Sequence, residues 1–137
     1  MRGNAGMQKR ILIINTGGTL SSVKGCNGLV PGMSSGDMLE ELRMVSRNLE
    51  LEAEDFCSLD SSNIGPEDWT GLAKLIAKRS YDYDGIVVIH GTDTLAYSSA
   101  MLSFMLQNIS IPVVVTGSQL SIANPVADAL EHLRFAP

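Results

Sequence analysis

The sequence has no apolar run long enough to cross a membrane and no excess of positive charge. Its longest uninterrupted apolar runs are four residues, 11–14 and 86–89, whereas a membrane-spanning helix needs roughly 20. The formal net charge is −5 and the pI is about 4.8, the wrong sign for binding nucleic acid through its phosphates. We therefore expect that the protein binds neither membranes nor nucleic acid.

Cysteine is scarce, and the glycine-rich signatures of nucleotide sites are missing. Cys26 and Cys57 lack the spacing of a zinc site or a redox pair, and no secretory apolar segment precedes Ile11. Neither G-x-G-x-x-G at a helix start nor G-x-x-x-x-G-K-S/T occurs. We expect a cytoplasmic protein without a dinucleotide or phosphate-loop site.

The composition fits one soluble domain. The chain has 137 residues, of which 45% are hydrophobic and 18% charged, values typical of a globular protein. We expect residues 1–9 to be disordered and residues 10–137 to form the domain. Residues 37–68 contain ten carboxylates and only two arginines. This excess of negative charge most simply indicates a solvated acidic surface.

Continuous and alternating apolar patterns predict four strands. Residues 10–15, 84–90 and 111–116 are β-branched apolar runs, typical of parallel strands that are covered on both faces. Residues 49–57 alternate apolar and acidic side chains, which predicts a strand with one wet face.

Helical periodicity between the strands predicts four helices. Ser34 and Asp37 have the spacing of a capping box. Pro66 opens a second amphipathic helix, Asn124–Pro125 a further one, and residues 95–106 are apolar almost all round, which predicts a helix buried on several sides. We therefore predict an α/β fold, an open and mainly parallel sheet with helices on both faces and right-handed crossovers.

Polar residues directly after each predicted strand mark the edge where ligands bind in such sheets. The four motifs are Thr16-Gly17-Gly18-Thr19, Leu59-Asp60-Ser61-Ser62-Asn63, His90-Gly91-Thr92-Asp93-Thr94 and Thr116-Gly117-Ser118-Gln119. These motifs also have purely structural explanations: a turn for the glycines, and helix capping for the residues near Asp60 and Asp93. For His90, a structural hydrogen bond is the favoured role. The recurrence at four strand ends favours a site.

These four motifs, with Pro66-Glu67-Asp68-Trp69, resemble bacterial L-asparaginases, and more the cytoplasmic type I branch than the periplasmic type II branch. The resemblance covers about residues 10–135. It implies hydrolysis of L-asparagine to L-aspartate and ammonia through a threonine ester, without a metal or organic cofactor, in a cytoplasmic homo-oligomer.

The resemblance also implies residue roles. Thr19 matches the nucleophile, Thr92 the second threonine in the proton-transfer arm, and Asp93 the carboxylate that contacts the substrate amino group. Ser61 matches the position that meets the α-carboxylate. The substrate-binding set implied in this way is Gly18, Asp60, Ser61, Ser62, Gly91, Thr92, Asp93 and Ser118. A threonine hydroxyl needs a base to act as a nucleophile, and amides in a glycine turn suit an oxyanion.

The sequence departs from the family pattern in two places. The family has a lysine downstream of the Thr-Asp pair, whereas the last lysine here is Lys78, before the pair. Many members place a tyrosine in the loop after the nucleophile, where this chain has Leu29; the Ser21-Ser22 pair is one possible replacement. The glycines at 25, 28 and 32 predict a loop that acts as a lid.

Two functions therefore remain open. In one, the chain is the N-terminal part of an asparaginase, with its C-terminal domain absent and its own activity weak or nil. In the other, it is a noncatalytic amino-acid-binding or assembly fragment of an asparaginase. Either protein associates with further copies or with the missing C-terminal portion. An acyl site of lysophospholipase type cannot be located, and the acidic balance gives no support for action on transfer RNA.

Overall fold

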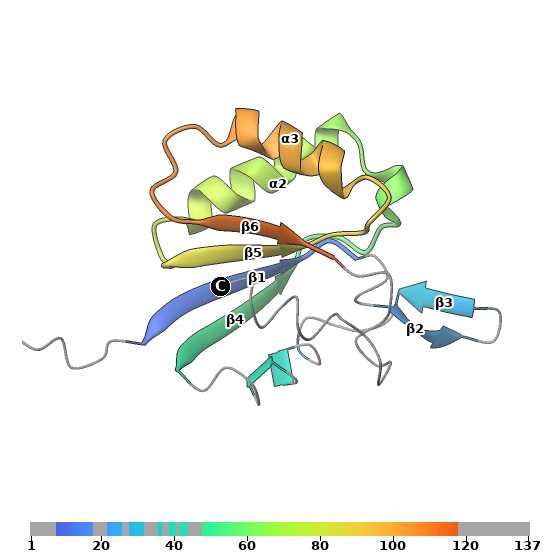
Figure 1. Cartoon of the computed structure of the whole chain (residues 1–137), viewed down its shortest axis with the longest axis horizontal. Coiled ribbons are helices and arrows are strands. Elements are labelled where there is room, and N and C mark those ends of the chain that lie inside the picture. Colours follow the sequence, from blue (N-terminus) through green and yellow to red (C-terminus); the bar gives the residue numbers. More distant parts are fainter. Residues whose placement is uncertain are drawn as a thin grey trace, which may run out of the picture.

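The computed structural model describes residues 8–17, 22–25, 28–31, 36, 39–40, 42–43 and 48–117. They contain a four-stranded parallel sheet in the order β4-β1-β5-β6, formed by β4 (Leu49–Asp55), β1 (Lys9–Asn15), β5 (Gly85–Ile89) and β6 (Val113–Thr116). Helices α2 (Pro66–Arg79) and α3 (Leu95–Met105) cover one face (Figure 1). The α/β prediction is confirmed. β1 begins at Lys9, one residue before the predicted start of the domain, and Lys9 pairs with Leu49 of β4.

The two central strands are buried on both faces, as their continuous apolar runs predict. All five residues of β5 are buried, as are residues 11–15 of β1. Alternate side chains point into two separate clusters. Toward α2 and α3 lie Leu12, Ile14, Ile86 and Val88 with Leu72, Ala73, Ile76 and Leu102; on the opposite face lie Ile11, Ile13, Leu51, Val87 and Ile89 with Leu39 and Leu42.

Helix α2 begins where its sequence signals predict. Pro66 occupies the first turn, where its missing N–H costs nothing, and Glu67 and Asp68 place negative charge at the positive end of the helix. The Asp68 carboxylate accepts a hydrogen bond of 2.9 Å from the Gly65 N–H. The face that carries Leu72 and Ile76 packs on the sheet. The predicted capping pair Ser34 and Asp37 lies outside the described residues.

The glutamates of β4 are less solvated than the alternating pattern predicts. Leu49, Leu51 and Ala53 pack into the core, as expected. Their neighbours Glu52 and Glu54 are half-buried, because Arg10 and Tyr83 bind Glu52 and Arg79 binds Glu54. This face of β4 is therefore an ion-paired surface.

The segment expected to be a loop contains a hairpin. Strands β2 (Ser22–Gly25) and β3 (Gly28–Pro31) pair antiparallel, with Gly25 opposite Gly28. In Figure 1 the hairpin lies on the arrowhead side of the main sheet. A two-residue connection between paired strands is the commonest hairpin geometry. The strands were missed because each has four residues and ends at a glycine or proline.

The prediction that helix 95–106 is buried on several sides is wrong. Ser98 and Leu102 are its buried residues, while Tyr97 and Phe104 are 69% and 76% exposed. The helix packs mainly on α2 and on β6 of the sheet. No helix in the described part of the chain has the length and apolar character needed to span a membrane.

Candidate active site

Three glycines, two of them against backbone and one against a side chain, lie where the carboxyl ends of all four parallel strands come together. The distance from a Cβ atom placed on each glycine to its nearest neighbour shows how close the segments are. A Cβ on Gly17, after β1, would lie 2.7 Å from the Leu59 carbonyl oxygen, in the segment after β4. One on Gly91, after β5, would lie 2.6 Å from the Ser61 Cβ, and one on Gly117, after β6, would lie 2.3 Å from the His90 carbonyl oxygen. Glycine is required where backbone segments approach this closely. The four motifs therefore meet at one edge.

The turn after β1 is fixed by buried hydrogen bonds. The Thr16 hydroxyl donates to the Ile89 carbonyl at 2.8 Å, and the Asn15 side chain accepts from the Gly17 N–H at 3.0 Å while donating to Asp55 at 2.9 Å. Gly17 has φ +99°, a conformation that residues with a Cβ rarely adopt. The Thr16 hydroxyl therefore has a structural role: it joins this turn to the end of β5.

The segment after β4 presents an exposed carboxylate. Asp60 precedes a one-turn 3₁₀ helix, η2 (Ser61–Asn63), and its Oδ1 accepts from the Ser62 N–H at 2.9 Å and from the Ser62 hydroxyl at 2.7 Å. These hydrogen bonds, the backbone one first, lower the pKa of Asp60. The capping role considered for Asp60 is thus present, and its carboxylate remains exposed and ionised at neutral pH.

Ser61 and Gly91 lie against each other at the centre of this edge. Ser61 is buried, and its Oγ would lie 2.7 Å from a Cβ on Gly91. The Thr94 hydroxyl donates to the Ser61 carbonyl at 2.7 Å, which joins the segments after β4 and β5. Sequence reasoning missed this contact, since nothing in the spacing of Ser61 and Thr94 indicates a pair.

The Thr-Asp pair lies directly beyond a buried histidine. The His90 Nδ1–H donates to the Gly91 carbonyl at 2.7 Å, and the His90 N–H donates to the Thr116 carbonyl at 2.8 Å. Nε2 of His90 is buried and has no hydrogen-bond partner among the described residues. The structural role favoured for His90 is thus supported by a contact that fixes the peptide before Thr92.

Neither Thr92 nor Asp93 caps the helix that follows. The N-cap of α3 is Thr94, whose hydroxyl bonds to Ser61 in place of a capping bond. Asp93 is exposed, Thr92 is half-buried, and both lie beside the Ser61–Gly91 contact in the chain. The N-cap position predicted at Thr92 or Asp93 is thus occupied by Thr94, and the exposed Asp93 carboxylate can meet a cation.

Six of the predicted site residues are described and lie on two adjoining segments: Asp60, Ser61, Ser62, Gly91, Thr92 and Asp93. Gly18, Thr19 and Ser118 lie outside the described residues. They follow Gly17 and Gly117 in the sequence, the two glycines held at this edge. Leu29 is in β3, where its backbone is opposite Lys24. In the described part of the chain, no three His, Cys, Asp or Glu residues are grouped to hold a metal ion.

The chain is similar to known L-asparaginases over most of its length. Residues 10–136 match the family described as "Asparaginase, N-terminal". L-asparaginase of Thermococcus kodakarensis is 44% identical over 129 residues, and L-asparaginase 1 of Escherichia coli is 40% identical over 134; each match covers 93% of this chain and 39% of the relative. A glutamyl-tRNA(Gln) amidotransferase polypeptide of Thermoplasma acidophilum is 33% identical over 129 residues, which cover 93% of this chain and 32% of that relative.

The fold agrees as well. The solved structure of the Thermococcus kodakarensis enzyme superposes with a TM-score of 0.83 at 43% identity, over 93% of this chain and 39% of that one. The chain spans about two fifths of the length of the L-asparaginases it matches. By its sequence match and its sheet, the chain belongs to the asparaginase family, whose N-terminal domain it represents.

Proposed function

We propose that this chain is the N-terminal part of an enzyme that hydrolyses L-asparagine to L-aspartate and ammonia. The observation that carries the proposal is the contact of the Asp60–Ser62 segment with the Gly91–Asp93 segment at the edge where Gly17 and Gly117 are also held. These two segments include Asp93, whose exposed carboxylate suits an ammonium group, and Ser61, whose hydroxyl suits a carboxylate. Two of the relatives are named L-asparaginases.

In the proposed reaction, the Thr19 hydroxyl oxygen attacks the side-chain amide carbon of asparagine. A bond forms between this oxygen and the carbon, the carbon–nitrogen bond breaks, and ammonia leaves with the proton from the hydroxyl. Water then cleaves the aspartyl ester and restores the Thr19 hydroxyl. Thr92 belongs to the arm that moves the proton, and the amides near Gly18 and Gly91 stabilise the oxyanion.

Charge complementarity supports the substrate. Free asparagine has one ammonium and one carboxylate, and Asp93 is the exposed carboxylate assigned to the ammonium. Asp60 adds a second carboxylate that is ionised at neutral pH, because its pKa is lowered by Ser62. Ser61 is the neutral donor assigned to the α-carboxylate, and Ser62 acts through Asp60, to which its hydroxyl and N–H both donate. Ser118 follows Gly117, which contacts His90.

The 137 residues contain no lysine after the Thr-Asp pair. The last lysine is Lys78, in α2, so the lysine that the family resemblance implies has no match among these residues. We propose that the 137 residues bind the amino acid and that efficient turnover requires the C-terminal portion. An oligomer in the cytoplasm is the setting that the type I resemblance implies.

A fusion tests the proposal. The chain is joined to the C-terminal part of E. coli L-asparaginase 1 that its match does not cover, and ammonia release from L-asparagine is measured for the fusion and for the chain alone. We expect turnover by the fusion and little by the chain. A fusion that folds, as circular dichroism shows, and releases no ammonia would contradict the catalytic proposal.

The alternative is a noncatalytic fragment that retains the amino-acid pocket. Leu29 favours it, since leucine cannot transfer a proton. Calorimetry with L-aspartate separates the two functions when combined with the fusion. Binding by the chain with an inactive fusion supports the alternative, whereas binding with an active fusion supports the enzyme.

A further inference from the structure

Ser61 contacts the chain on both sides of the Thr-Asp pair. On one side, a Cβ placed on Gly91 would lie 2.6 Å from the Ser61 Cβ. On the other side, the Ser61 carbonyl oxygen accepts a hydrogen bond of 2.7 Å from the Thr94 hydroxyl. Thr92 and Asp93 are the two residues between these contacts. The position of the pair relative to Ser61 is therefore fixed at both of its ends.

The Thr94 hydroxyl makes this contact in place of a local one. Thr94 is the N-cap of α3, where a threonine side chain ordinarily accepts a hydrogen bond from the first turn, and it makes no such bond here. Its carbonyl oxygen accepts the Ser98 N–H at 2.9 Å, so the backbone begins the helix without help from the side chain. The hydroxyl instead joins a residue 33 positions away in the sequence.

The partner of Thr94 is a carbonyl in a well-ordered turn. The Ser61 carbonyl oxygen also accepts the Ile64 N–H at 3.2 Å, and this bond closes η2. The Asp60 carboxylate accepts the Ser62 N–H and hydroxyl at the start of the same turn. Ser61 itself is 3% exposed. The Thr94 hydroxyl therefore binds a segment that its own hydrogen bonds already hold.

The other contacts of the first turn of α3 lead to different elements. The Trp69 indole N–H donates to the Ser98 hydroxyl at 2.8 Å, which joins α3 to α2, and Ser98 is fully buried. The Leu95 side chain would lie 3.3 Å from a Cβ on Gly117, after β6. Neither contact involves the segment after β4. The Thr94 hydroxyl supplies a hydrogen bond between that segment and the start of the helix.

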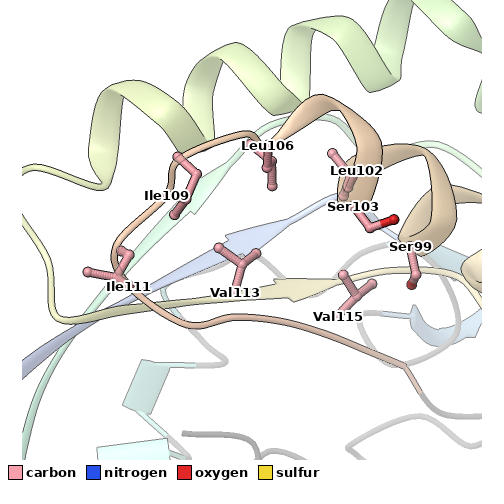
Figure 2. A pocket seen from close by; sticks show the side chains of 8 residues that line it. All are labelled: Ser99, Leu102, Ser103, Leu106, Ile109, Ile111, Val113 and Val115. Carbon is pink, nitrogen blue, oxygen red and sulfur yellow. The ribbon is translucent and has the colours of Figure 1, made fainter.

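The remainder of α3 is packed less closely on the sheet. In Figure 2, Leu102 and Leu106 face Val113 and Val115 across a groove of about 380 Å³. In the part of the chain that the structure describes, the space between α3 and β6 is therefore not filled. The contacts of the first turn, more than packing along the helix, fix where α3 begins.

We propose that Thr94 is a positioning residue of the site: its hydrogen bond to Ser61 sets the distance between Ser61 and Asp93. The inference rests on the proposed function, in which Ser61 meets the α-carboxylate and Asp93 meets the ammonium group. An α-amino acid has both groups on one carbon atom, so their two partners must lie at a set spacing, with a tolerance of about 0.5 Å. Thr94 acts through Asp93 and does not itself touch the amino acid.

Calorimetric binding of L-aspartate by the full chain tests the inference. Thr94→Val replaces the hydroxyl with a methyl group of similar size, and the Ser61 carbonyl keeps its bond to the Ile64 N–H, so no buried acceptor is left unpaired. We expect Thr94→Val to fold and to bind at least about tenfold more weakly than the wild type, because the spacing of the two partners is no longer held. Thr94→Ser keeps the hydroxyl and should bind within about threefold of the wild type.

The matched control is Thr70→Val. The Thr70 hydroxyl also donates to a backbone carbonyl, that of Pro66, at 2.8 Å, but on the surface of α2. We expect this variant to bind L-aspartate as the wild type does. If circular dichroism shows Thr94→Val to be unfolded, Thr94→Ala, which removes the same hydroxyl without a branched side chain, is held to the same tenfold expectation.

A double-mutant cycle on the binding affinity separates positioning from a purely structural role. In the Asp93→Asn background, Thr94→Val should lower the affinity further by less than about threefold, because the carboxylate that Thr94 positions is already lost. A purely structural Thr94 would lower the midpoint of thermal unfolding and leave the affinity of the folded protein unchanged. Equal factors for Thr94→Val in both backgrounds would show that Thr94 does not act through Asp93, and would overturn the inference.

The remaining outcomes distinguish this inference from the proposed function. Equal affinity of the wild type and Thr94→Val, or equal losses in Thr94→Val and Thr94→Ser, would overturn the inference alone. Absence of L-aspartate binding by the wild type would overturn amino-acid binding by this chain, and the inference with it.

Discussion

Charged residues lie at both ends of the parallel sheet, but those at the amino end are ion-paired and those at the carboxyl end are exposed. At the amino end, charges neutralise each other: Arg10 binds Glu52 at 2.6 Å and lies over the Tyr83 ring, and Lys9 pairs with Asp84. At the carboxyl end, the carboxylates of Asp60 and Asp93 are exposed. The hydrogen bonds of Asp60 come from its neighbour Ser62 and leave the carboxylate charged and exposed. The comparison teaches that the ion pairs lie at one end of the strands and the carboxylates proposed to bind a ligand lie at the other.

The largest expected effect tests the carboxyl end through the nucleophile. In the active fusion, Thr19→Ala should lower ammonia release at least about a thousandfold, because no other hydroxyl replaces it as the attacking group. The matched control is Thr70→Ala, whose hydroxyl donates to the Pro66 carbonyl on the surface of α2. Similar losses in both variants, measured as kcat, would contradict the assignment of Thr19.

A second prediction tests the close approach of the strand ends. Gly117→Ala should destabilise the chain by about 1–3 kcal/mol, since its Cβ would meet the His90 carbonyl oxygen and the backbone must shift. Gly65→Ala is the control, because nothing lies within 4 Å of its Cβ, and its expected cost is below about 1 kcal/mol. Urea unfolding measures both variants, and equal costs would mean that the strand ends are not tightly packed.

A third prediction concerns the amino end alone. Tyr83→Phe removes a hydrogen bond of 2.7 Å to Glu52 and should cost about 1 kcal/mol at pH 7, with no change in amino-acid binding. Burial, and then the Glu52 carboxylate, raise the pKa of Tyr83 to about 12. Because the folded pKa exceeds the ordinary value of about 10, this contribution is complete below pH 10 and is lost as the pH rises through 12.

Unfolding of both proteins from pH 7 to pH 12 checks this prediction. The difference in unfolding free energy between the wild type and Tyr83→Phe should shrink between pH 10 and 12. A difference that stays constant over this range would show that the Tyr83–Glu52 hydrogen bond does not contribute as described. A loss of L-aspartate binding in Tyr83→Phe would contradict the separation of the two ends.

Much of the fold could be predicted from apolar runs and helix-start signals that extend over several residues. The runs at 11–14 and 86–89 predict strands covered on both faces, and β1 and β5 are the buried centre of the sheet. Proline and acidic residues predict the start of α2 because they satisfy backbone rules within one turn. The parallel order then brings the polar motifs to one edge, which is why their proximity was predictable.

The errors come from contacts between segments far apart in sequence. The open side of α3 depends on its place over β6, the outermost strand among the described residues. Composition alone made Tyr97 and Phe104 look like core residues. The Thr94–Ser61 hydrogen bond joins residues 33 positions apart, and the burial of Glu52 depends on Arg10 and Tyr83. Local periodicity gives no information about these contacts, because they form between segments that only tertiary packing brings together.

The most direct test of the account is calorimetric binding of L-aspartate by the full chain and by two matched variants. Asp93→Asn removes the exposed carboxylate at the carboxyl end, whereas Asp82→Asn makes the same change at an exposed residue at the amino end. The account predicts binding by the wild type and by Asp82→Asn, and affinity at least about tenfold lower for Asp93→Asn, a free-energy loss of about 1.4 kcal/mol or more. Absence of binding by the wild type, or equal affinity in all three proteins, would contradict it.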